Sequence, residues 1–470
     1  WFVFCPARPC NAKEHTADIL RDTHGVPHIF ADDEQAAYYA LGYSEAEDSA
    51  YWMIYDLLSV EGRLSEFFHP DSNGSLNITM IDEDIKSRAL DYMGLAASWT
   101  DLPQDVRDIL CAYAQGFNHG VRTLDTDGRL DALHPFHEDI SPADAIRAFG
   151  PVTPQHLAAL LLRSNAGNAL FNLSDAEQAT HGKASISVGG ASNAVALGPG
   201  RVAGLHAPVV YGDLHNPWQG NQRVAHMQIG GRTVFGQFMG PYLIAGRAHR
   251  LALAFTRNHC DGADVFIEKI NPDNPDQYLA EDGYEPFRIT METIKIRRHK
   301  NMVAPIYHSR NGWIWNYPTT RSNPEQAHAV RIAAMDTSGG PLAPLQSVVQ
   351  RLRLTRLESV RDFYALARRP HLSQRHYIIA DDSGNIASAW LGRIPVRRGP
   401  DDTDYSRPVP GWNTQYGWTR AVWTLGDPNF PLPFHLNPPG GHLRSANNSP
   451  WLTAGCGPDS HRPAWLSLDV

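Results

Sequence analysis

The sequence predicts an α+β protein with a mostly helical first part and a second part rich in β-strands. Before about residue 165, apolar residues recur at steps of three and four, the spacing of one helix face. From Ser192 onward, short β-type runs alternate with clusters of turn residues. A stretch rich in Asn, Ser, Ala and Gly lies between them and has the composition of an exposed linker. We therefore divide the chain into a helical region (1–168), a linker (169–191) and a β-rich region (192–470).

The helical region opens with two strand-like pieces within residues 17–31, broken at Gly25 and Pro27. Helical spacing follows over 34–47 and again over 50–60. A third helix opens at Pro103, and a fourth covers 154–163. The apolar face of the third helix is formed by Val106, Leu110, Tyr113 and Phe117.

The β-rich region contains five clear strand signals before residue 300 and one hairpin after it. The five strand signals cover 224–229, 233–239, 251–256, 265–270 and 289–296. The runs 377–380 and 386–391 flank Asp-Asp-Ser-Gly-Asn, a strong hairpin signal. Between Gln346 and Arg368 the apolar spacing becomes helical, which predicts a helical insertion in the β-rich region.

The composition is that of a globular protein. Hydrophobic residues make up 42% and charged residues 19% of the 470 residues, enough to bury a large core. The formal net charge of -9 gives no reason to expect nucleic acid or an anionic membrane as a partner. No apolar run approaches the ~20 residues needed to span a membrane. The five cysteines show none of the paired spacings of a zinc site.

The junction between linker and β-rich region carries the first candidate for chemistry. Gly189, Gly190 and Ala191 precede Ser192, and small residues let the backbone bend sharply there. The Ser192 hydroxyl could attack the preceding carbonyl, and cleavage would leave Ser192 at the start of a new chain. That residue would then hold nucleophile and base together, because an α-amine has a pKa of about 7.7–8.0. The alternative is a Gly-rich turn before a strand, with the serine there by chance.

A series of short motifs in a fixed order narrows these alternatives. The motifs are 21–29 (RDTHGVPHI), 42–48, 61–66 (EGRLSE), 192–193, 213–215 (DLH), 251–256 (LALAFT) with Asp261 and Asp264, 271–275 (NPDNP), 408–412 (PVPGW) and 446–450 (ANNSP). In this order they resemble the penicillin amidase family of N-terminal nucleophile hydrolases, which includes penicillin, cephalosporin and acyl-homoserine lactone acylases. The resemblance covers about residues 17–460.

The resemblance implies a four-layer αββα sandwich and a precursor that cuts itself before Ser192. A spacer is then lost, and the resulting α and β chains stay associated. Ser192 is implied to be the nucleophile and its freed amine the general base. The family also implies a periplasmic or secreted protein, a small-molecule N-acyl amide as substrate, and a C-terminal region that continues beyond the equivalent of Val470.

Further site residues follow from the same resemblance. Asn447, the first Asn of ANNSP, matches the side-chain donor to the oxyanion, and the backbone amide of Arg257 matches the second donor. His215 is implied to orient the nucleophile, and Asn193 to lie near its amine. The alternatives are an Asx turn at Asn447 and an ordinary loop histidine at His215. An arginine at position 257 departs from the small or apolar residue expected there.

Asp261, the carbonyl of Ala263 and Asp264 match part of a calcium site in the penicillin acylase branch. These are hard oxygen ligands suited to Ca²⁺, but calcium takes six or more, and the others do not match clearly. The alternative is two solvated loop aspartates. The chemistry itself requires no cofactor, since nucleophile, base and oxyanion donors all come from the chain.

The function predicted on these grounds is hydrolysis of an N-acyl amide through an acyl-enzyme on Ser192. A Ser-His-Asp hydrolase is less favoured, because residues 190–194 do not form a Gly-x-Ser-x-Gly elbow. A metallohydrolase is disfavoured because the sequence has no His-Glu-x-x-His run. An inactive relative that serves as a binding or structural protein remains the alternative from another class.

Overall fold

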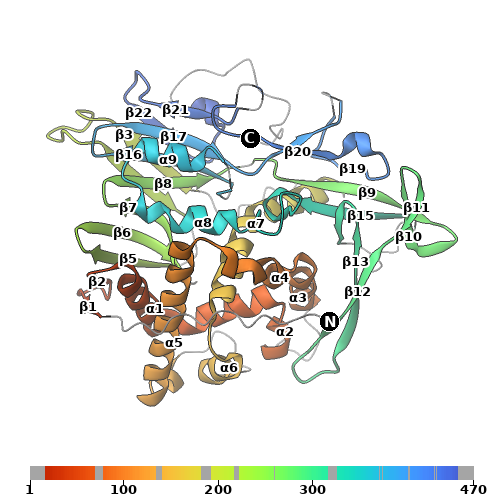
Figure 1. The fold of residues 1–470 in the computed structure, drawn as a ribbon, viewed down its shortest axis with the longest axis horizontal. Helices are drawn as coiled ribbons and strands as arrows, with labels where there is room; N and C mark the ends of the chain where they lie inside the picture. The colour runs from red at the N-terminus through yellow and green to blue at the C-terminus, as the bar shows by residue number, and fades with distance from the viewer. Residues whose placement is uncertain are drawn as a thin grey trace.

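The computed structural model describes residues 16–68, 78–133, 140–180, 192–215, 222–258, 260–315, 325–369, 371–372, 374–400, 403–427, 429 and 431–453. The helical first part and the strands of the second part form separate layers, with the helices filling one half of the molecule (Figure 1). The α+β class predicted from the sequence is therefore correct.

Two long helices that run side by side in the same direction, α1 (Glu34–Glu61) and α5 (Gln104–Thr126), form the centre of the helical part. Glycines let their backbones come close, because a Cβ at Gly116 would lie 1.8 Å from the carbonyl oxygen of Tyr39. The two helical segments predicted over 34–47 and 50–60 are one helix with a kink at Ser49, where φ is -158°. The Ser49 hydroxyl donates to the carbonyl oxygen of Glu45 there, a bond that often bends helices.

Shorter helices pack around this pair: α2 (Leu64–Phe67), α3 (Ile78–Leu90), α4 (Tyr92–Leu95) and α6 (Pro142–Phe149). The last helix of this part, α7 (Pro154–Thr180), is longer than predicted. It extends into the segment expected to be a linker, so residues 169–180 are helical. The rest of that segment, 181–191, lies outside the described residues.

Sheet A has nine described strands, seven from the second part of the chain and two from residues 17–31 of the first. In spatial order it contains β1 (Ala17–Arg21), β2 (Pro27–Ala31), β5 (Gln222–Ile229), β6 (Arg232–Met239), β7 (Tyr242–Ala248), β8 (Leu251–Arg257), β16 (Arg375–Asp381), β17 (Ile386–Leu391) and β21 (Phe434–Leu436). Among the described strands of sheet A, β2 and β5 pair in parallel and the other neighbours pair antiparallel. The predicted hairpin is present as β16 and β17, paired antiparallel.

Sheet B covers one face of the middle of sheet A. It contains β22 (His442–Ser445), β3 (Ser192–Leu197) and β4 (Val209–Leu214), all antiparallel. Ala194 and Ala196 of β3 pack against Ala254 and Ile378 of sheet A. Small side chains on both sheets allow this close packing. On the opposite face of sheet A lie α8 (Gln346–Leu352) and α9 (Val360–Ala367), the predicted helical insertion (Figure 1).

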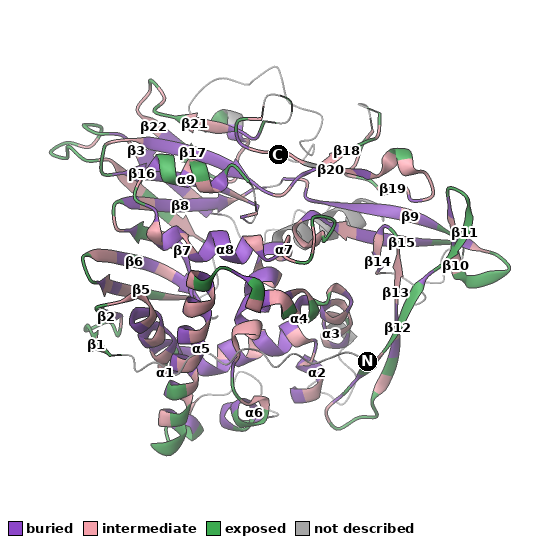
Figure 2. Cartoon of the chain, in the orientation of Figure 1, coloured by how far each residue is buried: buried purple, intermediate pink, exposed green. Residues whose placement is uncertain are grey.

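Sheet C extends away from sheets A and B. It contains β11 (Gly283–Pro286), β10 (Asn274–Ala280), β9 (Ala263–Asn271), β15 (Gln326–Ile332), β14 (Gly312–Ile314), β13 (Met302–Ser309) and β12 (Arg288–Ile294), and β19 (Val409–Pro410) pairs with β9. A short ribbon of β18 (Pro395–Arg397) and β20 (Trp418–Val422) lies nearby. Burial is greatest where the helices meet sheet A and least at the outer hairpins of sheet C (Figure 2). None of the described helices combines the length and the apolar character needed to cross a membrane.

Candidate active site

Ser192 is the first residue of β3 and is 7% exposed. Residues alternate between the faces of a strand, so its side chain lies on the same face as those of Ala194 and Ala196, toward sheet A. Its backbone N–H donates to Oδ1 of Asn447 over 2.6 Å. The start of β3 is thus held by a residue 255 positions later in the chain.

Asn447 links Ser192 to the end of β8. Its backbone has φ of +62°, a left-handed conformation that Asn tolerates better than most residues. Its Nδ2 donates to the carbonyl oxygen of Arg257 over 2.8 Å. Since a carboxamide has two N–H donors, the second can reach another acceptor. The structure therefore brings together three of the predicted site residues: Ser192, Asn447 and Arg257.

Arg257 contributes differently from the expected arrangement. It is the last residue of β8, and its carbonyl, rather than its amide, contacts Asn447. Its partner across the sheet is Arg375, the first residue of β16. Two arginines therefore lie directly opposite each other at the end of sheet A nearest Ser192.

His215 and Asn193 lie on the other face of sheet B. Asn193 pairs with Asp213 in the β3–β4 register, and both alternate with residues that face sheet A. Nε2 of His215 is 3.1 Å from Nδ2 of Asn193 and 3.2 Å from Oδ2 of Asp213. Within the described part of the chain, no hydrogen bond joins His215 to Ser192. The structure thus places His215 beside Asn193 and Asp213.

Buried polar side chains lie beneath this corner, between sheets A and B. The hydroxyls of Thr256 and Ser445 are 2.7 Å apart, and both residues are at most 2% exposed. Thr256 precedes Arg257, and Ser445 lies two residues before Asn447, so this pair ties together the two segments that Asn447 bridges. His376 pairs with Thr256 across the sheet. Burial lowers the pKa of His376 to about 3, which keeps its imidazole neutral.

At the predicted calcium site, the guanidinium of Arg397 lies between the two aspartates. Both Asp261 and Asp264 form ion pairs with Arg397, at 3.0 and 2.8 Å, and the Arg397 side chain is 8% exposed. The indole N–H of Trp418 also donates to Asp264. Ala263 belongs to the β9–β15 ladder, opposite Ile332. Because a guanidinium already bonds both carboxylates, these residues do not fit a calcium ion. The described residues contain no group of three or more His, Cys, Asp or Glu arranged to hold a metal.

Burial and ion pairing shift the pKa values of Asp261 and Arg397. Burial raises the pKa of Asp261 to about 7 although Arg397 opposes the shift. Burial by itself would lower the pKa of Arg397, but Asp261 and Asp264 outweigh it and raise that pKa. The cluster fixes the turn between β8 and β9, four residues after Arg257.

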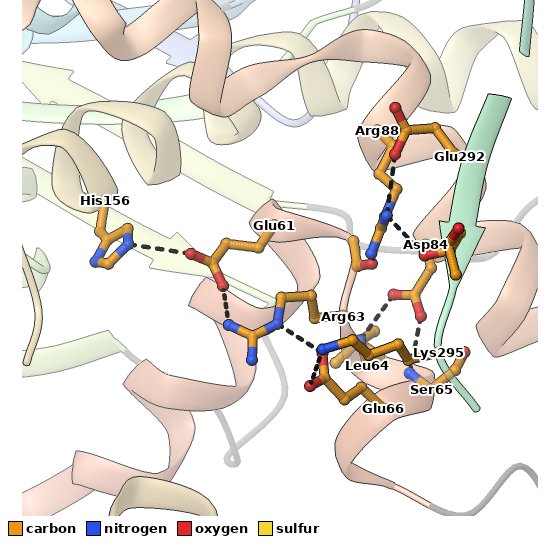
Figure 3. Close-up of polar contacts among 12 residues, drawn as sticks. Glu61, Arg63, Leu64, Ser65, Glu66, Asp84, Arg88, His156, Glu292 and Lys295 are labelled. Carbon is orange, nitrogen blue, oxygen red and sulfur yellow. Dashed lines mark hydrogen bonds and ion pairs between the residues drawn. The ribbon is translucent and has the colours of Figure 1, made fainter. Parts of the chain in front are cut away.

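The motif 61–66 has a structural role in the helical part (Figure 3). Gly62 ends α1 in a left-handed conformation, with φ of 65°. Arg63 pairs with Glu61 and Glu66. The carboxylate of Asp84 accepts from the backbone N–H groups of Leu64 and Ser65 at the start of α2. Arg88 bonds the carbonyl of Gly62 and also Glu292 of β12, which connects the helices to sheet C.

Sequence reasoning missed Arg397, Arg375 and the pair of Thr256 with Ser445. Arg397 lies 133 residues after Asp264, and Ser445 lies 189 residues after Thr256. No local spacing connects such residues. The one available signal was the pair of Asp261 and Asp264, which indicates a cation without specifying that it comes from the chain.

The protein is thus an α+β protein in which the buried Ser192 is the first residue of β3. The carboxamide of Asn447 bonds both the backbone of Ser192 and the last residue of β8, Arg257. The family model for penicillin amidase matches residues 16–467. The chain therefore belongs to the penicillin amidase family, as its motifs predicted.

Individual relatives are distant. A penicillin acylase 2 proenzyme from Pseudomonas sp. (strain SE83) is 24% identical over 480 residues, which cover 92% of this chain and 58% of that protein. An acyl-homoserine lactone acylase PvdQ from Pseudomonas fluorescens (strain Pf0-1) is 24% identical over 343 residues, 68% of this chain and 44% of that protein. The chain spans about half the length of these curated relatives. Among solved structures, a thermostable penicillin G acylase from Alcaligenes faecalis matches with a TM-score of 0.46 and 21% identity over 55% of this chain and 44% of that chain.

Proposed function

We propose that this chain is an acylase that hydrolyses an N-acyl amide through an acyl-enzyme on Ser192, formed after the chain cuts itself between Ala191 and Ser192. The observation that carries the proposal is the carboxamide of Asn447, which contacts both the backbone nitrogen of Ser192 and the carbonyl of Arg257. Membership of the penicillin amidase family and the acylase names of its relatives support it.

In the proposed mechanism, cleavage turns the backbone nitrogen of Ser192 into a free α-amine. Oδ1 of Asn447 already accepts a hydrogen bond from this nitrogen and would hold the amine in place. The amine takes the proton of the Ser192 hydroxyl as that oxygen attacks the substrate carbonyl, and later returns a proton to the leaving amine. Partial burial of Ser192 favours the neutral amine, the form able to act as a base.

Charge that develops on the substrate oxygen needs hydrogen-bond donors. The second N–H of the Asn447 carboxamide and the backbone amide of Arg257 are the proposed pair. The left-handed backbone at Asn447 and the buried bond between Thr256 and Ser445 fix the distance between these two groups. The proposed role of His215 and Asn193 is to hold the start of β3 against the end of β4, next to the N-terminus that cleavage creates at Ser192.

The proposed whole protein is larger than the described fold. We place sheets A and B in the middle of a four-layer αββα sandwich, with the α and β chains of one precursor associated, in a periplasmic or secreted protein. The substrate is a small N-acyl amide; a penicillin side chain and an acyl-homoserine lactone are the examples suggested by the names of the relatives.

The test separates processing from catalysis. In the protein without substitutions (the parent), N-terminal sequencing should find a fragment that starts at Ser192. The parent should also hydrolyse a chromogenic acyl-anilide. Ser192→Ala should stay uncut and inactive, because it lacks the attacking oxygen. Asn447→Ala, once processed, should lose about 10²–10³-fold in kcat, the usual effect of one oxyanion donor. A folded protein that hydrolyses amides with the 191–192 bond intact would overturn the mechanism, and a processed protein without hydrolysis would favour a binding function.

A further inference from the structure

Two histidines face each other where the first and second parts of the chain meet in sheet A. His28 of β2 and His226 of β5 are direct partners in the parallel register, so their side chains lie on the same face of the sheet. Their Nδ1 atoms are 3.1 Å apart, and their ring centres are 5.1 Å apart. Both residues are half-buried, so the space beside the rings is open to solvent. We call His28 and His226 the histidine pair.

A carboxylate orients the first ring of the pair. Oδ2 of Asp22 lies 3.5 Å from Nε2 of His28. Oδ1 of Asp22 accepts from the backbone N–H groups of His24 and Val26, so the turn between β1 and β2 holds this carboxylate in place. A proton on Nε2 of His28 faces the carboxylate and leaves the lone pair of Nδ1 directed at His226. A carboxylate on the far nitrogen of an imidazole is the usual outer partner of a metal-binding histidine.

Two phenylalanines contact the second ring of the pair. The ring centres of Phe30 and Phe235 lie 6.0 and 6.5 Å from that of His226. Burial and the neighbouring His28 lower the pKa of His226, which favours its neutral form. A neutral imidazole has one nitrogen without a proton, and this is the form that binds a metal ion.

The distances within the pair match two ligands of one metal ion. Imidazole nitrogens bind zinc at about 2.0–2.1 Å, so two of them are about 2.9–3.4 Å apart for ligand angles of about 90–109°. The ring centres are then about 4.5–5.2 Å apart. The observed separations of 3.1 and 5.1 Å fall within both ranges. Two neutral rings at these distances share a hydrogen bond; moving the His226 proton from Nδ1 to Nε2 frees both Nδ1 lone pairs for an ion, and neither ring loses a proton.

The ligand chemistry favours a transition metal over calcium or magnesium. Imidazole nitrogens suit Zn²⁺, Cu²⁺ and Ni²⁺, whereas calcium and magnesium prefer oxygen. Asp22 faces the far nitrogen of His28, so it acts on the ring and not on the ion. Two protein ligands leave the remaining positions of the ion to water.

We propose that His28 and His226 bind one divalent transition-metal ion, such as Zn²⁺, through their Nδ1 atoms, and that Asp22 positions His28 for it. β2 and β5 come from opposite sides of the bond between Ala191 and Ser192. The ion therefore joins the two parts of the chain whether or not that bond is cut. Because it binds the folded state, it stabilises the pairing of β2 with β5. The site is independent of the proposed acylase activity.

The first experiment measures zinc binding by calorimetry at pH 8, with metal-free parent protein that carries no histidine tag. The parent should bind one Zn²⁺ per chain. At a zinc concentration a hundred times the dissociation constant, its melting temperature should rise by about 2–4 °C. His28→Gln and His226→Gln each remove one ligand, and each should abolish both effects. Calcium at the same concentration should produce neither.

His206→Gln is the matched control, because His206 is an exposed histidine in the connection between β3 and β4. It should bind zinc as the parent does. No zinc binding by the parent, binding that survives in either variant of the pair, or binding lost equally in His206→Gln would overturn the proposal. Each variant of the pair tests it separately, so one that folds is sufficient.

Two further measurements test the assigned geometry. The EPR spectrum of the Cu²⁺ complex should show coupling to two nitrogen nuclei, and coupling to fewer would refute the two-histidine site. Asp22→Asn keeps an acceptor for the backbone N–H groups of His24 and Val26 but removes the negative charge beside His28. It should weaken zinc binding by about 10- to 100-fold, the usual effect of losing such an outer partner. Unchanged affinity in Asp22→Asn would overturn the positioning role of Asp22.

Discussion

Arg397 and Arg351 are both buried, yet their surroundings are opposite. Arg397 bonds the carboxylates of Asp261 and Asp264, which raise its pKa. Arg351 bonds only a backbone carbonyl and a carboxamide, and burial lowers its pKa. The first arginine therefore has its counter-charge within the fold. The second arginine has no carboxylate partner among the described residues.

The difference decides what each arginine contributes to stability. An ion cluster whose charges are all engaged can fix the turn between β8 and β9, next to Arg257, without a ligand. A buried cation without an anion reduces stability, because removing the charge from water is not offset by an ion pair.

Removal of Arg397 should reduce the free energy of unfolding the most. Arg397→Met leaves two buried carboxylates unpaired, and we expect a loss of about 3–5 kcal/mol in the free energy of unfolding. Urea unfolding of a soluble preparation measures it. A variant that also carries Asp261→Asn and Asp264→Asn should recover much of the loss, since it removes the charges together. A loss below about 1 kcal/mol in the free energy of unfolding of Arg397→Met would show that these ion pairs do not stabilise the fold.

Arg351→Met should have a smaller effect. It leaves Oδ1 of Asn165 without this donor, at about 1–3 kcal/mol, and removes a second donor from the Leu161 carbonyl, which lies inside α7. It also removes the penalty of an isolated buried charge. The two changes oppose each other, so we expect a net change within about 2 kcal/mol by the same measurement. A loss as large as that of Arg397→Met would mean that Arg351 has a carboxylate partner, and would remove the contrast between the two arginines.

The sequence predicted the elements whose signals are local. The spacing of Val106, Leu110, Tyr113 and Phe117 predicted α5, and all four are buried. The turn residues after Ala380 predicted the β16–β17 hairpin. The strand β7 was missed, because its face is set by close approach of backbones rather than by alternation. A Cβ at Gly246 would lie 2.2 Å from the carbonyl oxygen of Phe235 on β6.

The candidate site was predictable only through the resemblance. Nothing in local spacing joins Ser192 to Asn447 across 255 residues, whereas the order of the family motifs did. The same resemblance implied a calcium ion at Asp261 and Asp264, where both carboxylates bond Arg397. There the chain supplies its own cation from β18, and only the three-dimensional fold shows which residue it is.

The dependence of stability on pH tests the Arg397 cluster in a second way. The pKa of Asp261 is about 7 in the folded protein and near 3.8 in the unfolded chain. Between these values the folded state holds a proton that the unfolded state lacks. The contribution of Asp261 to the free energy of unfolding therefore falls as the pH rises from about 4 to 7, by at most about 1.4 kcal/mol per pH unit.

Asp261→Asn should remove that slope, which appears as the difference between parent and variant in urea unfolding at pH 4.5, 5.5, 6.5 and 7.5. A difference that does not change with pH would mean that Asp261 is already ionised throughout, with Arg397 compensating its burial completely.

The smallest expected effect concerns the neutral pair beneath the oxyanion donors. Thr256→Val and Ser445→Ala each leave one buried hydroxyl without its partner, whereas the double variant removes both. In contrast to the Arg397 cluster, no charge is exposed by either change. The pairwise coupling from a double-mutant cycle should therefore be about 1 kcal/mol, the value of one neutral hydrogen bond. Single losses that simply add in the double variant would show that the two segments bridged by Asn447 are held by packing, and that this hydroxyl pair does not position them.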